Sequence, residues 1–204
     1  EYYIRCIKTL KFKDKSIFSH LQKKYLTNKV CMESVLKVAT YISERYLQEF
    51  GKALDEMRLH KLLYFTQREC IIQTGDVMFD AEFRAWKYGP VIKEVRDAFK
   101  DGRLTETLSM ESQIKYREVF DYIFATYAKK SAFSLVTHSH SELSWERARA
   151  GFGEYDASDE PMKLEDIRED AERAKKWRAE AKIMQKVQAY IDAHKGELKG
   201  VFLL

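Results

Sequence analysis

Apolar residues recur at helical spacing along most of the chain. From residue 33 to residue 50 they follow three- and four-residue steps, which predicts an amphipathic helix that Gly51 ends. A second helix is predicted over about 56–74, where Gly75 and Asp76 break the pattern; its part from Met57 to Phe65 is apolar almost all round, which is typical of a helix buried on most sides. The first half of the chain therefore predicts two consecutive helices, of which the second is central.

The periodicity is lost after the second helix and returns later. We expect residues 76–88 to be irregular, with a short extended segment near 79–88. Pro90 suits the first turn of a third helix that runs to Lys100, because its missing N–H has no intrahelical partner there. A fourth helix is predicted over about 116–127, and one or two short helices over 131–150. The fold class is therefore mainly α, a compact multi-helix domain.

A long apolar stripe marks the C-terminal part, and its mean spacing is close to the coiled-coil period of about 3.5 residues. Its members are Ile167, Ala171, Ala174, Trp177, Ala181, Met184, Val187 and Ile191. This pattern predicts a C-terminal amphipathic helix. The stripe either docks on the domain's own core or contacts a partner. The acidic residues between 154 and 172 are interpreted as a solvated face and loop.

Composition restricts the class of protein. The chain has 204 residues with 45% hydrophobic and 13% aromatic content, which is typical of a globular protein. Apolar runs are too short for a membrane span, and three cysteines without metal-type spacing favour a reducing compartment. We therefore expect a cytoplasmic protein without a membrane segment.

The net charge of +4 is concentrated at the N-terminus. Residues 1–31 contain eight Lys/Arg and two Asp/Glu, giving +6, so residues 32–204 carry −2. We interpret 1–31 as a basic extension ahead of the natural start; the alternative is an arm that binds phosphates. The expected organisation is this extension, a domain over 32–170 and a helical extension over 171–204. Outside the arm, nothing leads us to expect a nucleic-acid partner.

Residues that suggest catalysis are few. His138 and His140 have a spacing that can ligate a metal, but no neighbouring ligand completes a known zinc site. There is no nucleophile elbow, phosphate-binding loop or dinucleotide motif. We expect the Thr137 hydroxyl to cap a helix and His138 to satisfy a buried hydrogen bond. The sequence predicts neither an enzyme nor a cofactor or metal site.

Several blocks in a fixed order resemble one known family. They are Lys61, Leu62, Leu63, Tyr64 and Phe65, then Phe79, Asp80 and Phe83, then Ala85, Trp86, Lys87, Tyr88, Gly89, Pro90 and Val91, then Thr137, His138, Trp145, Ala148 and Arg149. This order resembles the Panacea domain of SocA-like antitoxins over about residues 33–170. The chain departs from the family pattern at His60, where glutamine is frequent, and at Ser144, where a proline often precedes the tryptophan.

The resemblance implies an antitoxin of a toxin–antitoxin system, encoded near its toxin on a chromosome, prophage or other mobile element. It implies protein–protein interaction, in which direct binding masks the toxin. One alternative is an adaptor that delivers the toxin to an ATP-dependent protease. Another, from a different class of protein, is a nucleic-acid-binding regulator that uses the basic arm.

We expect the partner-binding residues to lie near residues 85–91 and near the histidine pair. The candidates are Arg84, Lys87, Tyr88, His138 and Trp145. The C-terminal helix is a further candidate for contact with the toxin. Trp86 and Leu62 are expected in the core.

Overall fold

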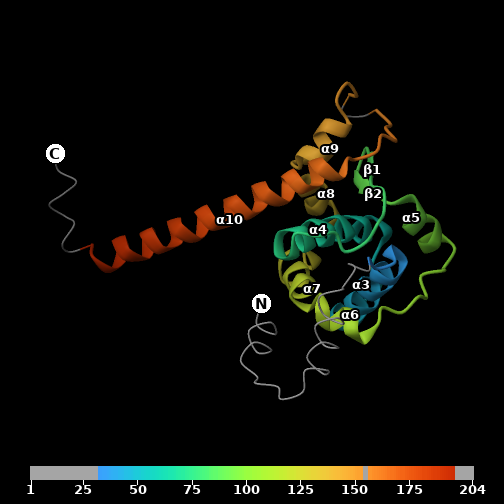
Figure 1. Cartoon of the computed structure of the whole chain (residues 1–204), viewed down its shortest axis with the longest axis horizontal. Helices are drawn as coiled ribbons and strands as arrows, with labels where there is room; N and C mark the ends of the chain where they lie inside the picture. Colours follow the sequence, from blue (N-terminus) through green and yellow to red (C-terminus); the bar gives the residue numbers. More distant parts are fainter. Residues whose placement is uncertain (1–31, 154–155, 196–204) are drawn as a thin grey trace, which may run out of the picture. The chain divides into compact units, whose positions relative to one another are not determined.

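The computed structural model describes residues 32–153 and 156–195 (Figure 1). The basic segment 1–31 lies outside the described residues, and so do 154–155 and 196–204. The chain divides into the units Glu1–Met32 and Glu33–Leu204, and the second unit contains every helix and strand of the described residues. This unit is mainly helical, as the sequence predicted.

The first two helices end where glycines allow it. Helix α3 spans Val35–Phe50 and α4 spans Glu56–Thr74, and both are followed by a glycine with positive φ (64° at Gly51, 83° at Gly75). The Asp55 side chain accepts a hydrogen bond of 2.9 Å from the Arg58 amide and so caps the start of α4. Both helices confirm the predicted pattern, although α3 begins two residues later than expected.

Helix α4 is the centre of the fold. Every residue from Leu59 to Ile71 is buried, and the helix contacts α3, α5, α7, α8 and α10 (Figure 1). Its buried positions include charged and amide side chains as well as apolar ones. Gln67, for example, donates to the Phe79 carbonyl (2.8 Å) and accepts from the Met78 amide (2.9 Å), which fixes the loop after α4.

A two-stranded antiparallel hairpin replaces the predicted start of the third helix. Strand β1 spans Arg84–Trp86 and β2 spans Gly89–Val91, with Ala85 opposite Pro90. Helix α5, Lys93–Lys100, begins only after the hairpin. The prediction for Pro90 was wrong because proline, which lacks an N–H, also fits an edge strand. Strand β1 confirms the predicted extended segment. On the side away from β2, the Ala85 amide donates a hydrogen bond of 2.8 Å to the Glu160 carbonyl.

Short helices complete the body. They are α6 (Met110–Lys115), α7 (Arg117–Ile123), the five-residue π-helix η1 (Phe124–Ala128), α8 (Ala132–His140) and α9 (Leu143–Ala148). The fourth helix predicted over 116–127 corresponds to α7 with η1, and the short helices predicted over 131–150 are confirmed.

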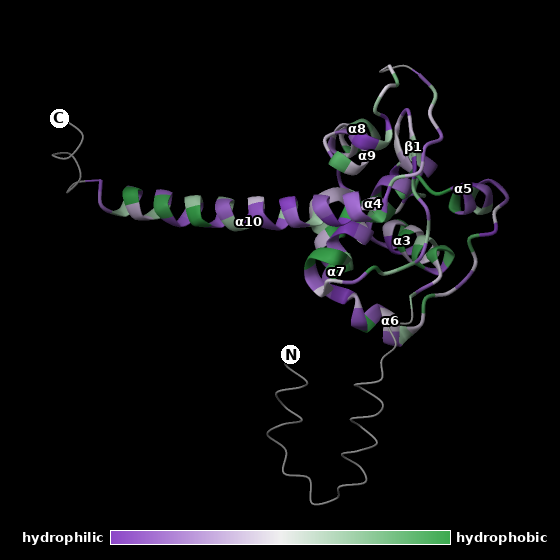
Figure 2. Cartoon of the chain, turned by 45° about the horizontal axis from the view of Figure 1, so that its top comes forward, coloured by the Kyte–Doolittle hydropathy of each residue, from purple (hydrophilic) through white to green (hydrophobic). Residues whose placement is uncertain are grey.

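Helix α10, Leu164–Ala193, docks on the body only at its beginning. Ile167 and Ala171 are buried, whereas Trp177 is 69% exposed and Met184 is 64% exposed. Figure 1 shows the helix leaving the body after its first turns, and Figure 2 shows hydrophobic residues recurring along the part that has left. Docking on the domain's own core therefore holds for the first turns of the predicted stripe and not for the rest.

Candidate functional site

A buried hydrogen-bond network joins α4, α9 and α10. The Tyr64 hydroxyl lies 2.9 Å from Asp170 Oδ2 and 3.0 Å from Ser144 Oγ, and burial raises its pKa well above the usual value. The Asp170 carboxylate also accepts hydrogen bonds from the amides of Leu143 (2.7 Å) and Ser144 (3.0 Å). These are first-turn N–H groups of α9, which no side chain of its own N-cap residue satisfies. A carboxylate on α10 therefore caps α9.

Two ion pairs extend the network along α4. The buried Arg68 pairs with Glu142, and its Nη2 donates to the Tyr127 hydroxyl at 2.7 Å. Burial raises the pKa of Glu142, and the positive charge of Arg68 opposes that rise. Next to Arg68, the buried Glu69 accepts two hydrogen bonds from the Arg178 guanidinium, at 2.7 and 3.1 Å. This bidentate pair holds α10 against α4 beyond the Asp170 contact.

A cleft of about 810 Å³ opens beside this network, between α10 and the wall formed by η1 and α8. We call it the α10 cleft. It is lined by Arg68, Tyr122, Thr126, Tyr127, Lys130, His138, Ser141, Glu142, Asp170, Arg173, Ala174, Lys176, Trp177, Arg178 and Glu180. Burial and the nearby charges of Lys130 and Arg68 lower the pKa of His138. Basic side chains outnumber acidic ones in the lining of the cleft. Two of them, Lys130 and Arg68, disfavour the protonated form of His138.

The hairpin rests on a buried lysine. Lys61 Nζ donates a 3.1 Å hydrogen bond to the Pro90 carbonyl, and burial lowers the pKa of this amine to about 7. Gly89 has a φ of 93°, and a Cβ atom there would lie 2.6 Å from Lys61 Cε and would also collide with Ser139 Oγ. Only glycine fits between the lysine and α8.

A second, more apolar cavity of about 540 Å³ lies on the hairpin. Its lining includes Trp86, Val91 and Tyr88, and the Tyr88 side chain is 56% exposed. Asp159 closes one end, accepting a 2.8 Å hydrogen bond from Trp86 Nε1 and pairing with Lys93. Lys93 and Trp86 lower the pKa of the Asp159 carboxyl. The cavity offers an aromatic wall with charged groups at its edge.

Trp145 connects the hairpin to the helices behind it. Its ring stacks on His140 with 3.8 Å between centroids, and its Nε1 donates to the Trp86 carbonyl at 3.0 Å. The Arg149 guanidinium lies 5.2 Å from the Trp145 ring centroid. The half-buried indole therefore joins α9 to the hairpin.

Two other kinds of feature are absent from the described residues. Among them, no group of three or more His, Cys, Asp or Glu side chains is arranged to hold a metal ion. Within the same ranges, no helix combines the length and apolar character that crossing a membrane requires. The one described cysteine, Cys70, is buried, and burial raises the pKa of its thiol.

Comparison with protein families gave one match, which covers part of this core. Residues 59–146 match the family described as antitoxin SocA-like, Panacea domain. This segment is similar to the Panacea domain. It begins within α4 and ends within α9, so it includes the buried polar residues of α4, the hairpin and the His138 wall of the α10 cleft. Comparison with curated proteins and with solved structures gave no match.

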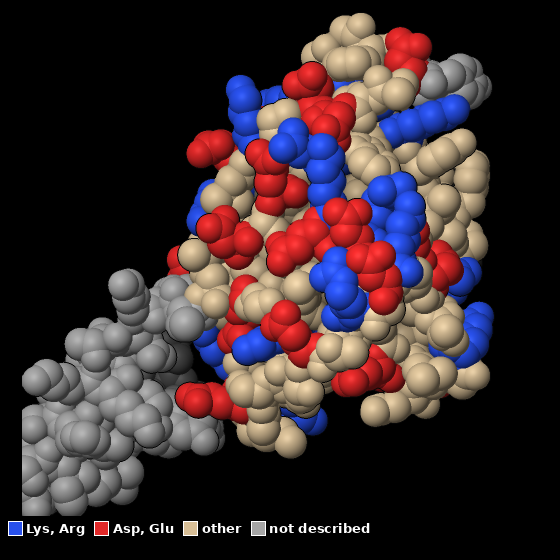
Figure 3. Space-filling view, turned by 90° about the vertical axis from the view of Figure 1, so that its right-hand side faces the viewer, with Lys and Arg blue, Asp and Glu red and all other residues tan. Residues whose placement is uncertain are grey.

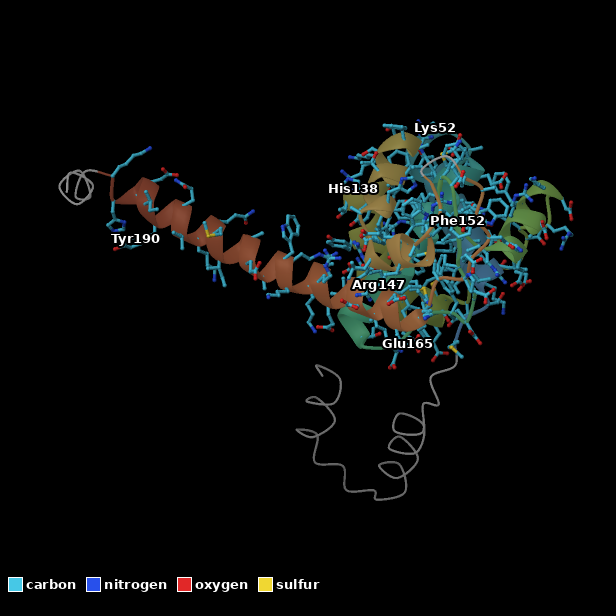
Figure 4. All side chains as sticks on the ribbon, turned by 90° about the horizontal axis from the view of Figure 1, so that it is seen from above. Lys52, His138, Arg147, Phe152, Glu165 and Tyr190 are labelled. Atoms are coloured by element: carbon cyan, nitrogen blue, oxygen red, sulfur yellow. The ribbon has the colours of Figure 1, made fainter. Side chains whose placement is uncertain are left out.

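The predicted interface residues of the Panacea domain do not form one cluster. Arg84, Lys87 and Tyr88 lie in or beside the hairpin, with Trp145 bonded to it. His138 lies on α8 in the wall of the α10 cleft, as seen from above in Figure 4. Whether any of them binds a partner stays a prediction.

Three local expectations were wrong. Thr137 does not cap a helix: it lies within α8, and its hydroxyl donates to the Phe133 carbonyl at 3.2 Å. His138 is exposed and makes no buried hydrogen bond with the described residues. Trp86 is half-buried instead of lying in the core, because its indole N–H reaches Asp159 at the surface. Leu62, by contrast, is fully buried as expected.

The network itself was not predicted from the sequence. Asp170, Glu142 and Arg178 come from segments far from α4 in the chain, and only the fold brings them to that helix. One signal was present: Arg68 and Glu69 stand between apolar residues of a helix expected to be buried, and charged residues at buried positions require partners.

Proposed function

We propose that this protein is an antitoxin that neutralises a cognate protein toxin by direct binding. The observation that carries the proposal is the Panacea domain over residues 59–146, whose family description is that of an antitoxin. The proposed partner is a toxin encoded nearby, and the proposed location is the cytoplasm. The proposed organisation keeps the domain at 32–170, followed by the helical extension 171–204.

The arrangement of the polar side chains supports binding over catalysis. Tyr64, Asp170, Arg68 and Glu142 pair with one another and with the start of α9. Because these side chains are bonded to one another, they stabilise the fold. We do not assign a general acid or a general base among them. The family description agrees with a role that needs no catalysis.

The exposed surface offers two regions for a partner. One is the hairpin cavity, where the exposed Tyr88 ring and Lys87 would border an inserted apolar side chain, with Arg84 on the adjoining strand β1. The other is the α10 cleft with His138 in its wall. Aromatic and arginine side chains of this kind contribute most to protein interfaces.

Co-expression tests the proposal. Inducing the reading frame next to this protein's gene should stop growth, and co-expressing this protein should restore it while the two proteins co-purify. If growth is not restored and no complex forms, the proposal is wrong. Toxin levels separate the two modes: masking leaves the toxin intact, whereas an adaptor lowers its level only in cells that have the ATP-dependent protease.

A further inference from the structure

The outer part of α10, residues 173–193, presents a wide apolar face to solvent. Its large hydrophobic side chains are exposed by 69% at Trp177, 60% at Ile183, 64% at Met184, 44% at Val187 and 61% at Tyr190. In a helix of about 3.6 residues per turn, positions seven, four and three apart share a side, so these residues form one continuous face. Nothing in the described part of the chain covers it.

The other side of outer α10 is basic. Residues 173–193 contain six Lys/Arg and two Asp/Glu. Lys175, Lys182 and Lys186 lie seven and four residues apart, so they share a side that flanks one edge of the apolar face. These three lysines and their neighbour Lys176 are exposed and form no ion pair with any other described residue. By contrast, Figure 3 shows acidic and basic side chains interspersed over the face of the body that includes α5.

The α10 cleft continues this surface toward the body. Arg173, Lys176 and Trp177 line the cleft and also belong to outer α10. The apolar face therefore begins at an aromatic ring that borders a hollow in which basic side chains outnumber acidic ones. The edge of a partner that covered outer α10 would therefore lie at the α10 cleft.

The charges decide between possible occupants. A second copy of the same helix would bring like charges together, which opposes pairing. A lipid surface would bury Glu180, which lies three residues from Trp177 and four from Met184 and so within the apolar face. Burying an unpaired carboxylate in hydrocarbon is costly, whereas a basic residue of a protein groove can pair with it.

We infer that outer α10 with the α10 cleft is the toxin-docking surface, and that it fits a groove with an apolar floor and an acidic rim. This inference rests on the proposed antitoxin function and names the surface that performs it. The apolar face enters the groove as a helix, and the lysines beside it meet the acidic rim. One acidic side chain of the rim enters the α10 cleft between Arg173 and Lys176.

The first experiment compares two matched double variants. Met184→Ser with Val187→Ser removes two exposed anchors from outer α10, and Met110→Ser with Ile114→Ser removes two exposed side chains from α6. Because all four are exposed, both variants should fold as the wild type does. We expect the α10 variant to bind the purified product of the adjacent reading frame at least about tenfold more weakly and to lose rescue of growth, whereas the α6 variant keeps both.

A second pair of variants tests the charge. Lys182→Glu with Lys186→Glu should weaken binding at low salt and reduce its salt dependence, because the lysines steer association toward an acidic rim. Lys52→Glu with Lys100→Glu changes two exposed lysines elsewhere and should leave binding unchanged.

The outcomes separate the two proposals. If the wild type neutralises and both α10 variants neutralise equally well, the docking inference is wrong and the antitoxin function stands. If the wild type neither rescues growth nor binds, both fail. Binding of the wild type, but not of the Met184→Ser and Val187→Ser variant, to vesicles that contain phosphatidylserine would also overturn the inference, because the face would then be a membrane surface.

Discussion

Replacing Lys61 by methionine should remove a specific pH dependence of stability. Lys61 is 1% exposed, and its amine donates a hydrogen bond to the Pro90 carbonyl. Methionine has a similar length and no charge, so it should fill the same space. The variant isolates the effect of burying an ionisable group beneath the hairpin.

The magnitude follows from the pKa of the amine. Burial lowers the pKa of Lys61 from 10.5 to about 7. Each pKa unit corresponds to about 1.4 kcal/mol, so the full shift disfavours the charged folded form by about 5 kcal/mol. Between pH 7 and 10.5 the unfolded chain binds this proton and the folded chain largely does not. The free energy of unfolding therefore rises with pH in this window, and the contribution of Lys61 to that rise is about 2 kcal/mol from about pH 7 to 9.

Urea unfolding followed by tryptophan fluorescence at about pH 7, 8 and 9 measures this effect. The free energy of unfolding of the wild type should increase with pH by about 2 kcal/mol more than that of Lys61→Met. Lys52→Met, which changes an exposed lysine, should keep the wild-type slope. Equal slopes for the wild type and Lys61→Met would refute the reasoning, because the proton would then be bound equally in both states.

Three further predictions concern a glycine, a helix cap and an ion pair. Gly89→Ala should lower the free energy of unfolding by about 3 kcal/mol or more in a denaturation assay, because φ is positive and the new methyl group would collide with Lys61 and Ser139. Gly51 also has a positive φ but has open space around it, so Gly51→Ala should lower the free energy of unfolding by only about 1 kcal/mol in the same assay. Asp170→Ala should cost about 2–4 kcal/mol in thermal unfolding, because it removes the cap of α9 and leaves buried donors unpaired. Glu69→Gln should weaken the attachment of α10, seen as faster amide hydrogen exchange in the middle of that helix with α4 unchanged, and equal exchange in both proteins would contradict this.

Local sequence signals predicted the helical part of the fold well. The bounds of α4 were predicted at both ends because apolar residues at helical spacing are followed by Gly75, whose positive φ ends the helix. The strand at 84–86 was predicted only as an extended segment. The role of Pro90 was wrong because proline suits both a first helical turn and an edge strand, and the choice depends on bonds to residues 160–162, which are distant in the chain.

The candidate site was less predictable, because its groups meet only after folding. The stripe on α10 showed an amphipathic helix, yet it did not show that docking would end near Ala171. The attachment near that point depends on polar contacts, of Asp170 with Tyr64 and of Arg178 with Glu69 further along the helix, and such contacts leave no apolar periodicity in the sequence. Likewise, His138 was noticed for its chemistry, while its position beside Lys130 and Arg68 depends on how α8 meets α4.

Because Asp170 caps α9, the smallest segment that can be exchanged between proteins as a folded unit has to include Asp170. The matched segment, residues 59–146, contains the start of α9 without the carboxylate that satisfies its first amides, and most of α4 without α3 or the first turns of α10. Cut at those limits, the segment would expose apolar surface of α4 on two sides. A chimaera designed to exchange the proposed toxin specificity should therefore keep the chain from α3 through Arg178 as one block, and place the junction in α10 after that residue.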